Sequence, residues 1–193
     1  MEDLIDGRCG WCGGDKLYQS YHDHEWGRLV SDDRALFGLV ILEGAQAGLS
    51  WITILRRRDA YRDAFLDFDP HKVALMTEVD IDRLMLCNGI IRNRLKIRSA
   101  ITNARAFLSV VAEYGSFVNY ISSFLPDGKP IVNHFEHLSD IPASTPLSDA
   151  IAKDMRRRGF KFFGTTICYA FLQSAGFVND HLVACSCRST LAK

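Results

Sequence analysis

The sequence predicts an all-α protein, and two observations carry this prediction. Apolar residues recur three and four positions apart over most of the chain, which is the spacing of one face of a helix. The alternation of apolar and polar residues that is typical of strands is scarce. The 193 residues contain no internal repeat, low-complexity tract or Pro/Gly/Ser-rich linker. We therefore expect one domain over residues 1–193, made of helices with short connections.

Eight segments follow the helical pattern. Five of them are followed directly by glycine, which ends many helices in the left-handed conformation. Thr145 and Pro146 supply an N-cap and a first-turn proline for the seventh segment. The predicted helices are residues 33–47, 52–65, 70–76, 79–88, 92–114, 117–124, 148–158 and 165–175.

The least regular segment is 125–144, which contains three prolines and an Asp-Gly pair. This composition predicts a surface excursion between two groups of helices. We expect its His134, Phe135 and His137 to make packing and solvent contacts rather than to form a site.

Neither a secretory signal nor a membrane span is predicted. The first ten residues are acidic and lack both a basic and an apolar region, so the expected location is the cytoplasm. Residues 36–55 are long enough to cross a bilayer, but they contain Glu43, Gln46 and three glycines. A central carboxylate costs roughly 2.5 to 3.5 kcal/mol on insertion scales. A buried helix followed by a turn is the better interpretation.

The formal net charge is zero, but the charges are unevenly distributed. Residues 1–33 hold eight acidic and three basic side chains, a net charge of −5, so the remaining residues carry +5. The basic residues gather in 56–58, 92–105 and 153–161, and no acidic residue lies between Arg83 and Arg105. Solvated helix faces and a surface that faces phosphates explain these clusters about equally well.

Six cysteines in a cytoplasmic chain indicate metal ligands or inert core thiols rather than disulfides. His181 and Cys185 are four residues apart, which places both on one face of a helix or turn, where they can share a metal. Cys9 and His22 could complete a zinc site of two cysteines and two histidines. Scattered thiols beside a core histidine are the alternative. Spacing does not choose between Cys9 and Cys12, His22 and His24, or Cys185 and Cys187.

Glu43 lies on the apolar stripe of its predicted helix, in register with Leu36, Val40 and Ala47. A carboxylate that faces inward must be paired or have its pKa displaced. It is either a core residue with a backbone or arginine partner, or the acid of a pocket. The second interpretation gains weight because Trp51 and the tyrosines of residues 17–27, LYQSYHDHEWG, are available as pocket walls.

Residues 156–171, RRRGFKFFGTTICYAF, predict a helix, a six-residue hairpin from Gly159 to Gly164, and a second helix. The two glycines allow a tight turn to point its backbone N–H groups outward, and the next helix adds the positive end of its dipole. Such a turn can clamp phosphates without reading sequence. Any pair of helices joined through glycines has a similar pattern.

Together these motifs resemble the 3-methyladenine-DNA glycosylase I family. The resemblance extends from about Cys9 to Cys187, and residues 113–141 contribute little to it. It is carried by CGW at 9–11, YHDHEWG at 21–27, LEGAQAGLSWITIL at 42–55, GIIRNRLKI at 89–97 and RRGFKFFGTTICYAFLQSAGFVNDH at 157–181.

The resemblance implies a helix-hairpin-helix fold, with that motif at about 148–175. It also implies one structural Zn²⁺ that joins the terminal segments, about 9–27 and 177–187. Cys12, His24 and Cys187 would then be bystanders. The implied zinc ligands are Cys9, His22, His181 and Cys185.

The implied active site binds a base flipped out of DNA. Glu43 would be the catalytic residue that contacts this base, Trp51 would stack on it, and Gly48 with Leu49 would fill the gap in the duplex. Phosphates beside the lesion would be held by the hairpin. The implied pocket residues are Tyr18, Tyr21, Trp11 and Trp26, and the hairpin residues are Gly159, Lys161, Gly164 and Thr165.

The implied activity is base-excision repair: hydrolysis of the N-glycosidic bond of 3-methyladenine in double-stranded alkylated DNA, by a monomer without a nucleotide cofactor. Residues 165–175 contain no lysine, so we expect no lyase reaction. Asp180 adjoins His181, and we expect it to have a capping or supporting role. Two rivals are a zinc-bound DNA-binding module without catalysis and a relative that excises another alkylated purine.

Overall fold

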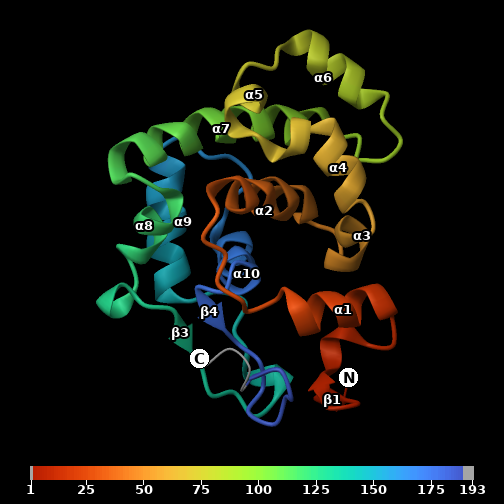
Figure 1. Ribbon diagram of the computed structural model, residues 1–193, viewed down its shortest axis with the longest axis vertical. Coiled ribbons are helices and arrows are strands. Elements are labelled where there is room, and N and C mark those ends of the chain that lie inside the picture. The colour runs from red at the N-terminus through yellow and green to blue at the C-terminus, as the bar shows by residue number, and fades with distance from the viewer. Residues whose placement is uncertain (1, 189–193) are drawn as a thin grey trace.

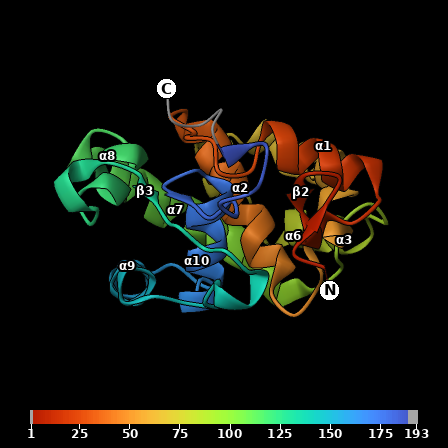
Figure 2. The ribbon, with the colours of Figure 1, turned by 90° about the horizontal axis from the view of Figure 1, so that it is seen from below.

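The computed structural model describes residues 2–188 and consists mainly of helices. Helix α2 (Asp33–Gln46) lies at the centre, with α7 (Arg94–Tyr114) across one side and α10 (Thr165–Ser174) against another (Figure 1). Viewed from below, α1 (Lys16–His24) lies on one side of the α2–α10 pair, and α8 (Phe117–Ser122) and α9 (Pro146–Arg157) lie on the other (Figure 2). No described helix is long and apolar enough to span a membrane.

The remaining elements are short. The other α-helices are α3 (Trp51–Leu55), α4 (Arg58–Ala64), α5 (Pro70–Ala74) and α6 (Glu78–Met85). The 3₁₀ helices are η1 (Gly10–Cys12), η2 (Leu66–Phe68), η3 (Pro126–Gly128) and η4 (Leu138–Asp140). The strands are β1 (Leu4–Ile5) with antiparallel β2 (Arg8–Cys9), and β3 (Ile131–Val132) with parallel β4 (Val178–Asn179).

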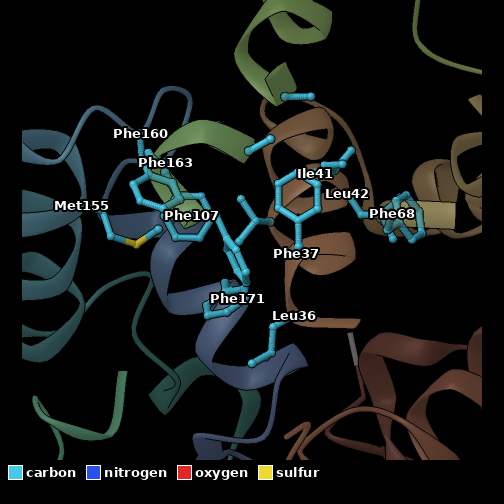
Figure 3. Packing of buried hydrophobic residues seen from close by; sticks show 14 of the residues in the cluster. Leu36, Phe37, Ile41, Leu42, Phe68, Phe107, Met155, Phe160, Phe163 and Phe171 are labelled. Atoms are coloured by element: carbon cyan, nitrogen blue, oxygen red, sulfur yellow. The ribbon is translucent and has the colours of Figure 1, made fainter. Parts of the chain in front are cut away.

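Aromatic side chains fill the space between α2, α7 and α10 (Figure 3). The rings of Phe37 and Phe107 lie 5.2 Å apart, and those of Phe107 and Phe117 lie 4.3 Å apart. Helix α2 is buried on nearly all sides, as its apolar sequence requires. This packing fixes α2 and α10 relative to each other, and both helices contribute to the site described below.

The helices predicted at 33–47, 70–76, 92–114, 148–158 and 165–175 are present with small shifts at their ends. The single helix predicted for 52–65 is wrong, because α3 ends at Leu55 and α4 begins at Arg58. Arg57 leaves the helical conformation, and its guanidinium donates to the carbonyl oxygen of Asn88 (3.2 Å). Arg58 pairs with Glu25. These distant partners interrupt a pattern that is locally continuous.

Helix α1 was not among the predicted helices; it is short, and most of its residues are polar. Asp15 caps it by accepting a hydrogen bond from the backbone N–H of Tyr18 (3.0 Å).

Segment 125–144 is more than a surface excursion, since β3 pairs with β4 near the carboxyl end. The N–H of Val183 also donates to the carbonyl oxygen of Phe135 (2.9 Å), and His137 contacts Asp3 (2.8 Å). The expectation that Phe135 and His137 make packing and solvent contacts is confirmed.

Candidate base pocket and metal centre

A cavity of about 350 Å³ opens beside the carboxyl-terminal end of α2. Its lining comes from η1, α1, α2, α3 and α10, from Trp26, and from Leu138 and Ile141 of segment 125–144. Trp51 packs against both hydrophobic clusters of the molecule, one around α2 and one around the terminal segments. The lining residues are Trp11, Tyr18, Tyr21, Trp26, Glu43, Gln46, Trp51, Leu138, Ile141, Ala170, Gln173 and Ser174.

Glu43 lies in this cavity with 1 % of its surface exposed. The Ser174 hydroxyl donates to its Oε1 (2.6 Å), and the Tyr21 hydroxyl donates to Ser174 Oγ (3.1 Å). Burial raises the pKa of Glu43 to about 8, although the hydrogen bond from Ser174 opposes this rise. The expected alternative, a core glutamate with an arginine or backbone partner, is wrong: among residues 2–188, its hydrogen-bond partner is Ser174.

Aromatic rings form most of the remaining wall. Trp11 makes edge contacts with Tyr18 (5.0 Å between ring centroids) and Trp26 (4.9 Å), and Tyr21 lies 5.6 Å from Trp51. Burial raises the pKa of Tyr18 to about 12 and that of Tyr21 well above the usual value, so both phenols stay neutral. The cavity therefore combines one carboxyl group with apolar faces that suit a planar ring.

Cys9, His22, His181 and Cys185 are all buried, and their ligand atoms lie within 4.8 Å of one another. Cys185 Sγ is 3.4 Å from His181 Nδ1 and 3.5 Å from His22 Nε2, and Cys9 Sγ is 3.8 Å from His181 Nδ1. A tetrahedral zinc ion places sulfur and nitrogen ligands about 3.6 Å apart. The donor set and its spacing fit such an ion.

The other ring nitrogens of the two histidines have partners that orient the rings. His22 Nδ1 lies 2.8 Å from an Asp23 carboxylate oxygen, and His181 Nε2 lies 3.2 Å from the carbonyl oxygen of Trp26. Arg8 in turn holds Asp23 (2.9 Å). Histidines that bind metals commonly donate their second N–H to such acceptors.

The extra cysteines have other neighbours. The Cys12 thiol donates to the carbonyl oxygen of Cys9 (3.2 Å), outside the group of four. Cys187 forms a second, partly exposed group with His22 and Asp23, and its thiol donates to Asp23 (3.4 Å). Geometry thus separates Cys9 from Cys12 and Cys185 from Cys187, which spacing alone leaves open.

The turn at Gly48 and Leu49 follows α2 directly. Gly48 has a φ of +80°, and a Cβ at this position would meet no atom within 4 Å. The Gln46 side chain donates to the carbonyl oxygen of Leu49 (2.7 Å), and Lys96 Nζ donates to the carbonyl oxygens of Ala45 (2.8 Å) and Ala47 (2.6 Å). These bonds hold the turn with the Leu49 side chain 37 % exposed.

The hairpin between α9 and α10 is anchored by Phe160 and Phe163, which are buried. Gly159 has a φ of +102°, in the region that favours glycine, as the predicted turn requires, whereas Gly164 has a φ of −73°, which any residue can adopt, and Phe162 has a φ of +55°. A Cβ at Gly164 would meet no atom within 4 Å, so the backbone there is open to a large ligand. Lys161 carries the backbone N–H that Asn103 binds.

Four polar residues of the site were missed by sequence reasoning, and one of them is Gln46, which lines the cavity at the end of α2. Ser174 and Gln173 lie near the end of α10 and face the cavity, and Asn103 lies on α7 beneath the hairpin. A buried polar residue in an apolar helix is the signal that could have found Asn103 and Ser174. Asp180 is buried and accepts hydrogen bonds from Asn133, Tyr169 and Gln173. Its carboxylate therefore supports neighbouring side chains.

The helical scaffold thus holds a buried carboxyl group in an aromatic cavity, an arrangement that suits a planar ring with polar edges. The family model for methyladenine glycosylases matches residues 11–189. The chain belongs to the methyladenine glycosylase family.

Curated relatives and solved structures agree with this assignment. DNA-3-methyladenine glycosylase 1 of Escherichia coli is 52 % identical over 180 residues, which cover 93 % of this chain and 96 % of that protein. DNA-3-methyladenine glycosylase of Haemophilus influenzae is 46 % identical over 95 % of this chain and 98 % of its own length. The structure of 3-methyladenine DNA glycosylase I from Staphylococcus aureus superposes with a TM-score of 0.91, at 40 % identity, over 94 % of this chain and 96 % of that one.

Proposed function

We propose that this protein is a DNA-3-methyladenine glycosylase of base-excision repair, which flips the damaged base into the cavity beside Glu43 and hydrolyses its N-glycosidic bond. Relatives of this name match nearly the whole chain, and a solved neighbour contains 3-methyladenine. The observation that carries the assignment of the site is the buried Glu43 carboxyl group in an aromatic cavity of about 350 Å³.

The reaction does not require a strong acid catalyst. Methylation at N3 gives the attached adenine a positive charge. When the glycosidic bond breaks, the electron pair of that bond moves to the adenine, so the base leaves as a neutral molecule. Water adds to the sugar and releases one proton. Extrusion of the base costs a few kcal/mol, less for a damaged pair. Leu49 would offset part of this cost by entering the vacated stack.

Selectivity comes from the pocket. A cationic ring is attracted to an aromatic face by roughly 0.5 to 2 kcal/mol, depending on desolvation. Trp51 would stack on the base, while Tyr18, Tyr21, Trp11 and Trp26 would shape the walls. An ionised Glu43 would prefer the cationic lesion to normal adenine through a charge-assisted hydrogen bond.

Zinc has a structural role in this proposal. Cys9, His22, His181 and Cys185 would hold one ion and thereby tie the amino-terminal segment to the carboxyl-terminal one. The His181 ring also contacts the Trp26 backbone, and Trp26 lines the cavity. A closed zinc site would thus stabilise one wall of the pocket.

DNA would be held through its backbone by a helix-hairpin-helix that spans about 148–175. Gly159, Lys161, Gly164 and Thr165 would bind phosphates without reading sequence. We further propose a single-domain monomer that acts in the cytoplasm without a nucleotide cofactor.

Replacement of Glu43 by Gln tests the function. The change keeps the size of the side chain but removes its charge, so single-turnover excision of 3-methyladenine should fall about ten- to a hundredfold, from the loss of a charge-assisted hydrogen bond worth roughly 1.5 to 3 kcal/mol. Released bases from methylated duplex DNA are separated by chromatography. A normal rate in the variant would overturn the pocket assignment, and no release by the unmodified protein would favour a DNA-binding module without catalysis.

A further inference from the structure

Glu43 has two carboxylate oxygens, and the structure treats them differently. Oε1 accepts the hydrogen bond from Ser174, whereas no described residue donates to Oε2. Because an ionised carboxylate can only accept, Ser174 must use its single hydroxyl proton for this bond. Its oxygen is then left to accept from a further donor, and Tyr21 supplies that donor at 3.1 Å. When Glu43 is ionised, the hydrogen bonds therefore run in one direction, from Tyr21 through Ser174 to Glu43.

We infer that Ser174 is a positioning residue for Glu43. Because Ser174 accepts a hydrogen bond from Tyr21, its own proton is donated to Oε1 of Glu43, and Oε2 is left as the oxygen that contacts the base. This inference rests on the proposed function, since it assigns a device to the same pocket. Ser174 is 6 % exposed and lies on α10, while Glu43 lies on α2 and Tyr21 on α1. The three helices must therefore pack correctly for the chain to form.

Glu43 is buried, yet among the described residues its carboxyl group has one hydrogen-bond partner, Ser174. A buried carboxylate loses its hydration, and a single hydroxyl does not replace it, so the charged form is disfavoured. The Ser174 hydrogen bond acts in the opposite direction and lowers the pKa of Glu43. Ser174 consequently influences both the orientation of the carboxylate and the fraction that is charged before the cationic base arrives.

Few other titratable groups face Glu43. The phenols of Tyr18 and Tyr21 face it from α1, and both are neutral near pH 7. On α10, Tyr169 donates to Asp180 instead. On α7, Lys96 is engaged with carbonyl oxygens at the end of α2.

Charged side chains are also present beyond Tyr21 and Ser174, in a second cavity of about 220 Å³ that these two residues help to line. Those groups pair with each other, as Arg58 does with Glu25 and Arg62 with Asp67. Among the described residues, none of these charged groups forms a hydrogen bond or ion pair with Glu43. The hydroxyl chain is therefore the direct polar influence on its carboxyl group.

Carbon-13 titration of the Glu43 carboxyl group tests the inference without relying on excision. The chain has six glutamates, so selective labelling gives a simple spectrum in which Glu43→Gln identifies the resonance. Replacing Ser174 by Ala should move the titration of Glu43 to higher pH, and replacing it by Thr, which keeps the hydroxyl, should restore the original midpoint. Melting curves verify that each variant is folded. An unchanged midpoint in Ser174→Ala would overturn the inference.

Excision kinetics at limiting protein concentration supply the second readout. Ser174→Ala should excise 3-methyladenine about tenfold more slowly near pH 7, the effect of one hydrogen bond to a charged group, and the difference should narrow as pH rises and Glu43 ionises. A uniform loss at every pH would indicate packing alone and would also overturn the inference. Ser123→Ala is the matched control. Ser123 directly follows α8, and its hydroxyl donates to the carbonyl oxygen of Tyr120 in that helix.

The role of Tyr21 is tested by a double substitution. Tyr21→Phe should shift the Glu43 titration in the same direction as Ser174→Ala but less, and adding it to Ser174→Ala should shift the midpoint no further. Additive shifts would contradict a chain through Ser174. Absence of excision by the unmodified protein, with the titration shifts present, would overturn the proposed function and leave the hydrogen-bond chain intact.

Discussion

Asn103 on α7 and Lys161 in the hairpin between α9 and α10 form two hydrogen bonds with each other. Asn103 Nδ2 donates to the carbonyl oxygen of Lys161 (3.0 Å), and the Lys161 N–H donates to Asn103 Oδ1 (2.7 Å). Lys96, seven residues earlier on α7, holds the end of α2 through Ala45 and Ala47. Residues seven apart lie on the same face of a helix. One face of α7 therefore holds both loops that are proposed to contact DNA.

Replacing Asn103 by Ala should weaken binding of undamaged duplex DNA and lower the thermal stability. It leaves the N–H and carbonyl groups of Lys161 without their partner, and each unsatisfied group costs roughly 1 to 3 kcal/mol where it stays buried. Fluorescence anisotropy and melting curves measure the two effects. If affinity and melting temperature both stay at their original values, Asn103 does not hold the hairpin.

Gly164→Val should weaken DNA binding with little change in stability. The backbone at Gly164 is open to any residue, and a Cβ there meets no atom. The added side chain would instead cover the backbone that a phosphate approaches. Binding of the original protein should fall as salt rises and should be nearly independent of sequence. Equal affinity in both proteins would argue against a phosphate contact at this position.

Lys96→Met should reduce the excision of 3-methyladenine more than it reduces binding of undamaged DNA. The ammonium group no longer binds the carbonyl oxygens of Ala45 and Ala47, so the turn that carries Leu49 loosens while the hairpin remains. We expect a loss of about tenfold in single-turnover excision, from one or two charged hydrogen bonds. Lys72→Met, on the exposed side of α5, is the control. Equal losses in the two variants would contradict a role for Lys96 in the turn.

Metal analysis of the purified protein should find about one zinc per chain if the four buried ligands bind as proposed. Cys185→Ser should abolish zinc binding and make both terminal segments sensitive to protease, because zinc binding contributes to folding. Cys187→Ser should retain the metal, since Cys187 lies in the neighbouring group with Asp23. Loss of zinc from both variants, or from neither, would show that the ligands are assigned incorrectly.

The stability of the folded protein should respond to the charge of Glu43. Its pKa is raised from 4.5 to about 8, so the folded state holds the proton more tightly than the unfolded state does. The stabilisation from the proton is complete below pH 4.5 and is lost as pH rises towards 8. Glu43→Gln, which does not titrate, should therefore gain stability relative to the original protein over this range, by up to a few kcal/mol. Parallel denaturation curves at pH 5 and pH 8 measure the gap, and a gap that stays constant would contradict a buried, shifted carboxyl group.

Local patterns in the sequence predicted much of the fold. The apolar period of α2 and its glutamate at the inward position, the N-cap at Thr145, and the glycine after α7 each depend on neighbours within a few residues. Such signals can be recognised in a single sequence because helix periodicity and capping are local properties. The metal ligands were predicted only through the family resemblance, since spacing alone left three choices open.

Tertiary structure decided the rest. The break between α3 and α4, the pairing of β3 with β4, and the position of Leu138 and Ile141 in the cavity lining depend on partners far away in the chain. The Ser174–Glu43 hydrogen bond joins residues 131 positions apart. A local pattern can show that Glu43 faces inward, but its partner depends on which helix packs against that face. The sequence therefore predicted a buried acid, and only the packing of α1, α2 and α10 determined its hydrogen bond and its pKa.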